Sequence, residues 1–220
     1  MANARNDAVI EATDTKAFAS MLDWPGWSRW AKTEDGAIET LLAYAPRYQP
    51  VVELAGLKRL SSSVNVVDRV PGGGATTFGV PDKVHAIEYE PIEGKELSRQ
   101  IGILRACWTF FDDVTASVSA ELRKGPRGGG RNRDQIVDHV VQADRGYARQ
   151  IGVKTPPFDS FDRAARDEHL EAVCAAMPDR SDGRVDGKGW PVGYFIRRAA
   201  WHILDHAWEM QDKDLTGEER

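Results

Sequence analysis

The sequence predicts an α+β protein in which a small N-terminal α/β lobe precedes a mainly α four-helix bundle. Two observations support this fold class. Before about residue 95, short apolar segments alternate with turns that contain Pro and Gly, a pattern typical of strands and short helices. After it, apolar residues recur every three or four positions over long stretches, which is the period of amphipathic helices. We therefore expect a lobe at residues 1–95 and a bundle at residues 96–220.

The lobe is expected to contain short strands and one helix. Pro25-Gly26 separates two short apolar segments, as in a strand–turn–strand unit. Thr33 is followed by two acidic residues and then by apolar residues at helical spacing, so it is the expected N-cap of a helix that ends at Pro46. A β-branched segment before Pro71 predicts a later strand. The expected strands are residues 16–23, 27–31 and 64–70.

Four helices are expected after residue 95. The first carries an apolar stripe and is broken by the glycine-rich loop 125–130. The second has Asn132 or Asp134 as its expected N-cap and Gly152 at its end. Four helices of this length are typical of a four-helix bundle. The expected helices span residues 96–122, 132–151, 160–177 and 191–212.

The composition limits the classes of function. The chain has 29 basic and 34 acidic side chains, so its formal net charge is −5 and a general nucleic-acid binder is not expected. Two cysteines are too few for a disulfide scaffold or a thiolate zinc site, which favours a reducing compartment. The start of the chain lacks a signal-peptide pattern, and no apolar run approaches about 18 residues. The composition therefore predicts a cytoplasmic protein with no membrane partner.

Three of the five histidines form a pattern suited to a metal ion. His202 and His206 are four residues apart, so a helix places both imidazoles on one face, one turn apart. His139 lies close to the apolar face of the second expected helix. Three imidazoles with an open fourth position are typical of a catalytic metal site rather than a structural one. Such ligands suit Zn, Ni, Fe or Cu, and an inward histidine can also be an ordinary core residue.

This arrangement resembles the DinB/YfiT-like superfamily of metalloenzymes. The similarity covers residues 96–220 and depends on a histidine in the second helix followed by H-x-x-x-H in the fourth. It implies that His139, His202 and His206 bind a divalent metal, with zinc or nickel expected first. It also implies a thiol S-transferase or isomerase that uses a low-molecular-weight thiol, and a homodimer. The N-terminal lobe is a departure from the family, so the substrate cannot be carried over.

Several polar residues near the expected site have more than one interpretation. Glu209 lies on the same helix face as the histidine pair, where it could accept a hydrogen bond from an imidazole, act as a general base, or be a solvated carboxylate. Arg127 and Arg131 belong to the glycine-rich loop between the first two helices. They could bind an anionic group of a substrate, although a solvated connector is the simpler interpretation.

The remaining histidines and both cysteines are not expected in the site. His169 lies among charged residues and is predicted at the surface of a helix, and His85 lies in a loop without a ligand at a useful spacing. Cys107 and Cys174 are surrounded by apolar residues, so they are expected to pack in the core.

The N-terminal lobe has a second resemblance. Residues 16–50, with the sequence DWPG between two expected strands and a helix after them, are similar to HicB-like antitoxin modules. This similarity implies a lobe that binds a partner or dimerises. Trp24, Trp27 and Trp30 could form an exposed aromatic surface for that purpose, or they could pack against the bundle.

Together these patterns predict a metalloenzyme that acts on a small molecule. The metal would activate a thiol or water for attack on a small electrophile, with a thiol-dependent transferase favoured over a hydrolase. The alternatives are a metal-binding protein without turnover and a regulatory protein that binds a partner through its N-terminal lobe. Catalysis predicts that the histidine cluster is open to a substrate. Partner binding predicts exposed tryptophans and a closed cluster.

Overall fold

The computed structural model describes residues 6–58, 60, 63–92, 94–185 and 187–217. These residues form a four-stranded sheet and a set of α-helices, with short 3-10 helices between them. The strands are β1 (Asp7–Ala12), β2 (Ala17–Met21), β3 (Ser28–Ala31) and β4 (Asn65–Pro71). The α-helices are α1 (Glu34–Ala43), α2 (Ala45–Leu54), α3 (Gly74–Thr77), α4 (Gly94–Ser117), α5 (Arg133–Ala148), α6 (Arg163–Ala176) and α7 (Val192–Asp212). The 3-10 helices are η1 (Ala86–Tyr89), η2 (Arg149–Ile151) and η3 (Pro178–Arg180).

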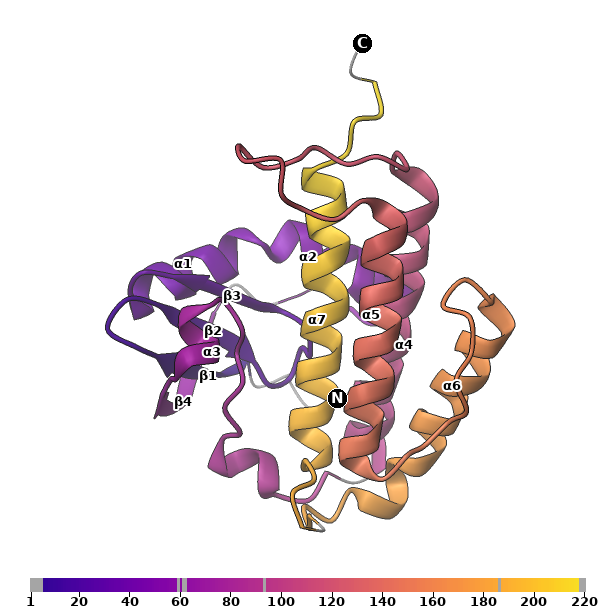
Figure 1. Ribbon diagram of the computed structural model, residues 1–220. Helices are drawn as coiled ribbons and strands as arrows, with labels where there is room; N and C mark the ends of the chain where they lie inside the picture. The colour runs from indigo at the N-terminus through magenta and orange to yellow at the C-terminus, as the bar shows by residue number, and fades with distance from the viewer. Residues whose placement is uncertain (1–5, 59, 61–62, 93, 186, 218–220) are drawn as a thin grey trace.

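Helix α7 lies between the N-terminal lobe and the other long helices (Figure 1). It packs against both α4 and α5, whereas α6 lies on the far side of α5 from the sheet. In the lobe, α1 packs on β2 and β3, and α2 packs on α4. One continuous hydrophobic cluster includes Ile10 of the sheet and Ile203 of α7. The lobe and the helices therefore share a core, which supports α7 along its whole buried face.

The predicted fold class is confirmed, because a small α/β lobe precedes a mainly helical part. The three predicted strands are present as β2, β3 and β4. Strand β1 was not predicted, although it lies in the middle of the sheet order β3-β2-β1-β4. It pairs antiparallel with β2 and parallel with β4. Its position depends on two partners rather than on its own short sequence.

The predicted helix after Thr33 is confirmed, but the chain beyond it differs from the prediction. The Thr33 hydroxyl accepts a hydrogen bond from the backbone N of Gly36 at 3.2 Å, so it is the N-cap of α1. Pro46 does not lead into a loop, because it occupies the first turn of α2. A proline is tolerated there since the first N–H groups of a helix have no partner within the helix.

The expected ends of the long helices are largely correct. Helix α4 ends at Ser117 rather than at residue 122, and Leu122 instead forms an isolated β-bridge with Asp214. The segment after α5 ends at Gly152, which has φ +77° as a helix-terminating glycine requires. Asp162 caps α6 and moves its start to residue 163. Pro191 is the N-cap of α7.

Two of the three lobe tryptophans are buried. Trp24 is 4% exposed and Trp27 is fully buried, whereas Trp30 is 46% exposed. Trp27 stacks on Tyr48 with ring centroids 5.6 Å apart, and its indole N–H donates to the carbonyl of Leu41 at 2.7 Å. Trp24 and Trp27 therefore belong to the core and do not form the exposed aromatic surface that partner binding through this lobe would need.

Polar and aromatic contacts join the lobe to α7. Arg29 of β3 makes an ion pair with Asp205 at 3.0 Å, and its guanidinium lies 4.5 Å from the centre of the Trp208 ring. Phe18 of β2 meets Trp201 edge-on at 6.3 Å. These contacts hold α7, which carries His202 and His206, against the N-terminal lobe.

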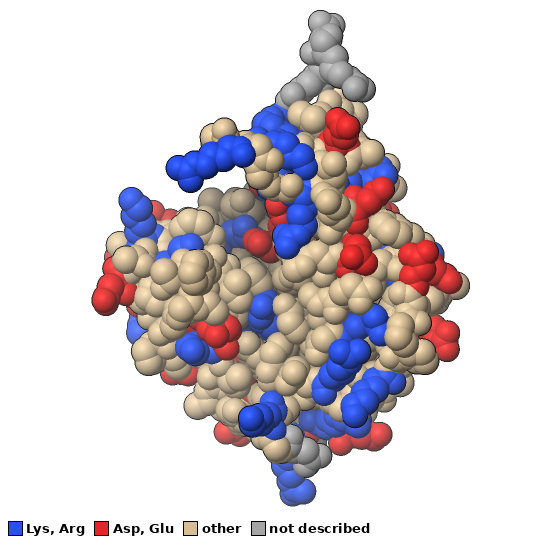
Figure 2. Space-filling model, viewed as in Figure 1, with Lys and Arg blue, Asp and Glu red and all other residues tan. Residues whose placement is uncertain are grey.

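The surface carries charges of both signs. Figure 2 shows acidic and basic side chains interspersed over the face on which α5 and α7 lie, with Lys and Arg on the loop between α4 and α5 at the top of this view. Among the described residues, no helix has both the length and the apolarity needed to cross a membrane.

Candidate metal centre

Three histidine side chains from two helices converge on one point. His202 and His206 lie one turn apart on α7, and His139 faces them from α5. Their ring centroids are 4.7 to 5.0 Å apart. One potential ligand nitrogen from each ring lies within 4.8 Å of the other two. The structure therefore brings together the three histidines that the sequence grouped.

The spacing of these nitrogens fits a metal ion. The Nε2 atoms of His139 and His202 are 3.2 Å apart. Two nitrogens bound tetrahedrally to zinc at 2.0–2.1 Å would be about 3.4 Å apart. His202 is 7% exposed, while His139 and His206 are half-buried. The cluster therefore lies at the edge of the core. His202 is on its buried side, and His139 and His206 reach the surface, where a further ligand could bind.

Glu209 is placed to orient His206. Its Oε2 lies 2.7 Å from His206 Nδ1, and Lys213 Nζ donates to its Oε1 at 2.5 Å. The hydrogen bond with His206, reinforced by Lys213 and opposed by burial, lowers the pKa of Glu209 to about 2. An ionised carboxylate can only accept a hydrogen bond, so His206 Nδ1 donates to it, and Nε2 is the nitrogen left to bind a metal. Such a low pKa favours a positioning role for Glu209 over a general base.

The other two histidines are held in the neutral form that binds metals. Burial lowers the pKa of His202 well below its ordinary value of 6.5, and the positive charge of Arg198, together with that of His206 when it is protonated, adds to this effect. Burial also lowers the pKa of His139. A neutral imidazole is required for coordination, so protons compete weakly with a metal at neutral pH.

The two loop arginines are not equivalent. Both Arg127 and Arg131 are exposed on the loop before α5. The charge of Arg131 contributes to the lowered pKa values of His139 and His202, so it acts on the cluster at a distance. Within the described part of the chain, no hydrogen bond or ion pair connects Arg127 to these histidines. Of the two arginines, only Arg131 has an electrostatic connection to the cluster.

The prediction that His169 lies at a surface is wrong. It is 4% exposed, with Nε2 3.2 Å from an Asp144 carboxylate oxygen and Nδ1 2.8 Å from the Thr155 hydroxyl. Asp144 is 25 residues away on α5, so sequence spacing does not reveal this partner. His85 is fully buried, and its Nδ1 lies 3.0 Å from Asp68 in the N-terminal lobe. Neither histidine belongs to the cluster.

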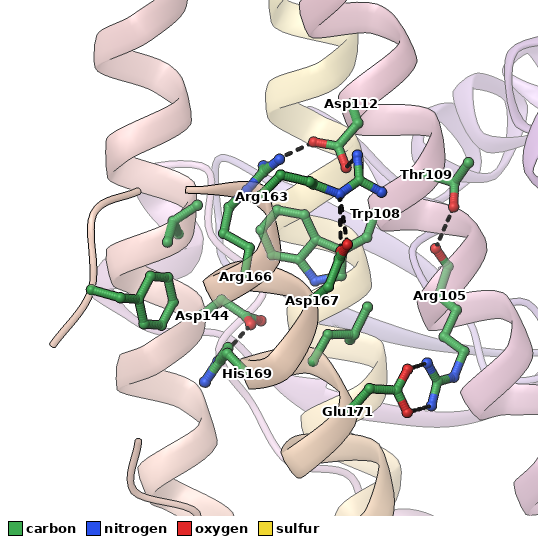
Figure 3. A pocket seen from close by; sticks show the side chains of 13 residues that line it. Arg105, Trp108, Thr109, Asp112, Asp144, Arg163, Arg166, Asp167, His169 and Glu171 are labelled. Atoms are coloured by element: carbon green, nitrogen blue, oxygen red, sulfur yellow. Dashed lines mark hydrogen bonds and ion pairs between the residues drawn. The ribbon is translucent and has the colours of Figure 1, made fainter. Parts of the chain in front are cut away.

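A separate cavity of about 290 Å³ lies between α4, α5 and α6. Figure 3 shows that its charged side chains point toward one another rather than into empty space. Arg163 and Arg166 both pair with Asp112, and Arg105 pairs with Glu171. The sequence analysis did not identify this cavity, because its lining comes from three helices. Its ionic groups are paired among themselves, so it does not extend the histidine cluster.

Both cysteines pack as predicted. Cys107 and Cys174 are buried and free, and burial raises the pKa of each thiol, to about 11 for Cys174. A thiol with a raised pKa is a poor nucleophile at neutral pH. These side chains therefore do not supply a reactive thiolate to the site.

The fold and the site define an α+β protein with a candidate tri-histidine metal centre between two helices of its bundle. No protein-family model, curated protein or solved structure matches the chain. The function must therefore be argued from the site itself.

Substitution of Glu209 should weaken metal binding without removing the ligands. Glu209→Ala leaves the His206 N–H without its carboxylate acceptor, so we expect about 10- to 100-fold weaker zinc binding. Glu209→Gln keeps a hydrogen-bond acceptor without the charge, so its zinc affinity should fall less than that of Glu209→Ala. Competition with a chromophoric chelator measures both affinities. Asp212→Asn, at an exposed position one turn further along α7, is the matched control and should bind zinc as the unmodified chain does. Equal affinity for Glu209→Ala and the control would contradict this role.

Proposed function

We propose that the chain is a metal-dependent enzyme of the DinB/YfiT-like kind, in which the tri-histidine centre activates a thiol or water for attack on a small electrophile. The observation that carries the proposal is the convergence of His139, His202 and His206, with the Nε2 atoms of the first two 3.2 Å apart. Three converging imidazoles that reach the surface on one side leave a coordination position for a reactant.

Each residue of the centre has a distinct part. His139, His202 and His206 would hold a divalent ion, with zinc or nickel the preferred candidates. Glu209 keeps a proton on His206 Nδ1, so that the Nε2 lone pair points away from the carboxylate. Lys213 holds the second oxygen of Glu209 and limits its rotation. When bound, the metal supplies Lewis acidity, which lowers the pKa of a thiol or water and makes it nucleophilic at neutral pH.

The nucleophile must come from outside the chain. Both protein thiols are buried with raised pKa values. A low-molecular-weight thiol is therefore our preferred co-substrate, which makes the reaction a thiol S-transfer or an isomerisation, and water is the alternative. The free, unpaired cysteines also agree with a reducing compartment, and we place the reaction in the cytoplasm. A homodimer is part of the same proposal.

The test combines metal analysis with a thiol-consumption assay. Protein purified without a histidine tag should carry about one zinc or nickel ion per chain, since the described residues hold one such cluster. It should also consume a small thiol in the presence of an electrophile such as a chloronitroarene. Chelation should abolish the activity, and zinc or nickel should restore it. Bound metal without turnover for any pair of thiol and electrophile would instead support the non-catalytic alternative, and absence of metal would reject the site.

A further inference from the structure

Arg198 is a buried cation beside the histidine cluster that has no counter-charge among the residues the structure describes. It is 8% exposed, and its Nη1 atom is buried with no hydrogen-bond partner. Within the described residues it makes no ion pair, in contrast to its neighbour Arg197, which pairs with Glu88 at 2.6 Å. A buried, unpaired charged donor is costly to keep, so its presence requires a reason.

The position of Arg198 on α7 directs it toward the cluster. It precedes His202 by four residues, so both side chains occupy the same face of the helix one turn apart. The guanidinium lies 5.0 Å from the ring centre of Tyr147, and that ring is 5.6 Å from the His202 ring. Trp201 also borders both, at 4.6 Å from the guanidinium and 6.0 Å from the His202 ring. Arg198 and His202 therefore contact the same two aromatic rings.

Among the described residues, these contacts leave the Arg198 guanidinium without an acceptor for its Nη1 hydrogen bond. The rings of Tyr147 and Trp201 hold the guanidinium by cation–π contacts, but they cannot accept the hydrogen bond that Nη1 offers. A carboxylate matches the fork of a guanidinium in shape and neutralises its single charge. Low solvent exposure strengthens such a pair, because little water competes with it.

The surrounding aromatic rings indicate the rest of the ligand. Trp190 lies 5.3 Å from Tyr147, with the two rings tilted by 37°. Rings of this kind favour a flat, unsaturated or aromatic body, which they can stack against. We infer that the substrate of the proposed metal centre is a small carboxylate with a planar body, and that Arg198 binds its carboxylate while the reacting atom lies at the histidines.

This inference rests on the proposed function, and its test does not require turnover. Benzoate is the probe and benzamide its uncharged counterpart of the same shape. Calorimetry or quenching of tryptophan fluorescence measures the binding of each to zinc-loaded and metal-free protein. We expect benzoate to bind more tightly than benzamide. Arg198→Gln should weaken benzoate binding about tenfold or more and leave benzamide binding unchanged. Arg198→Lys, which keeps the charge, should retain part of the preference.

Arg145→Gln is the matched control. Arg145 is equally buried, at 8% exposed, and its Nε also lacks a hydrogen-bond partner among the described residues. It lies on α5, with its guanidinium against Phe158 and Nη1 bonded to Gln142, and within the described part of the chain it makes no cation–π contact with the rings that border His202. Its substitution should leave the preference for benzoate intact. Thermal melting of each variant confirms that it is folded, and metal analysis confirms that the cluster is unchanged.

The outcomes separate the two proposals. Benzoate binding that depends on Arg198 in a chain that takes up no metal supports the anion site and rejects the metalloenzyme. Metal uptake with benzoate binding that is absent, equal to that of benzamide, or unchanged in Arg198→Gln overturns the inference and leaves the metal centre standing.

Discussion

The double variant His202→Ala/His206→Ala is expected to lose nearly all bound zinc or nickel. It removes two of the three imidazoles that converge in the structure and leaves His139 alone. A single imidazole does not hold a divalent ion against the competing ligands of a purification, since metal sites in proteins need three or four protein ligands. Metal content per chain, measured by mass spectrometry after purification without a histidine tag, should fall from about one ion to a trace.

His169→Gln is the matched control for this experiment. It removes a histidine that is also buried and also on a helix of the bundle, but whose nitrogens contact Asp144 and Thr155 instead of the cluster. Its metal content should equal that of the unmodified chain. Circular dichroism and thermal melting show that both variants are folded. Retention of more than half of the metal in the double variant would reject the assignment of His202 and His206.

Glu88→Ala is expected to cost the largest amount of stability among the substitutions considered. Glu88 and Arg197 are 4% and 2% exposed, and they form two hydrogen bonds, from Nε to Oε1 at 2.6 Å and from Nη2 to Oε2 at 2.9 Å. Among the described residues, removal of the carboxylate leaves the carbonyl of Lys83 as the one hydrogen-bond acceptor of this buried guanidinium. The free energy of unfolding should fall by about 3–5 kcal/mol. Urea denaturation at neutral pH measures this loss.

A second substitution tests the physical reason for the loss. If the cost comes from the uncompensated charge, Glu88→Gln/Arg197→Met, which replaces both partners by uncharged groups, should recover most of the stability. The exposed pair of Arg69 and Glu34 provides the control, since Arg69→Ala should leave the urea midpoint nearly unchanged. A double variant as unstable as Glu88→Ala would show that lost packing, not the charge, explains the effect.

Much of the helical part of the fold could be predicted from local sequence. The apolar period of three to four residues, Thr33 as an N-cap, Gly152 with its positive φ and Pro191 at the start of α7 all act within one or two turns of the chain. Strand β1 and helix α2 were missed for different reasons. The strand depends on pairing with β2 and β4, and Pro46 is compatible with either the end of one helix or the first turn of the next.

The candidate site was predictable where its residues share a helix. The spacing of His202, His206 and Glu209 places all three on one face of α7, and the structure shows Glu209 in contact with His206. The same reasoning could have included Arg198, one turn before His202, but charge and spacing alone did not distinguish it from a solvated arginine. Only the structure shows that Arg198 is buried and that its Nη1 has no hydrogen-bond partner among the described residues. His169 was misplaced because Asp144 lies on another helix.

The sequence by itself determined the fold class, the long helices and the pairing of His202 with His206, because a helix fixes which residues are neighbours within one or two turns. Only the tertiary structure decided which charges are paired. The carboxylate partner of Arg197 is 109 residues away, and that of His169 is 25 residues away on another helix. The contact between His139 and His202 likewise joins residues 63 positions apart. Such contacts depend on how the sheet and helices share one core. The burial that results lowers the pKa of His202 and encloses Arg198, which has no ion-pair partner among the described residues.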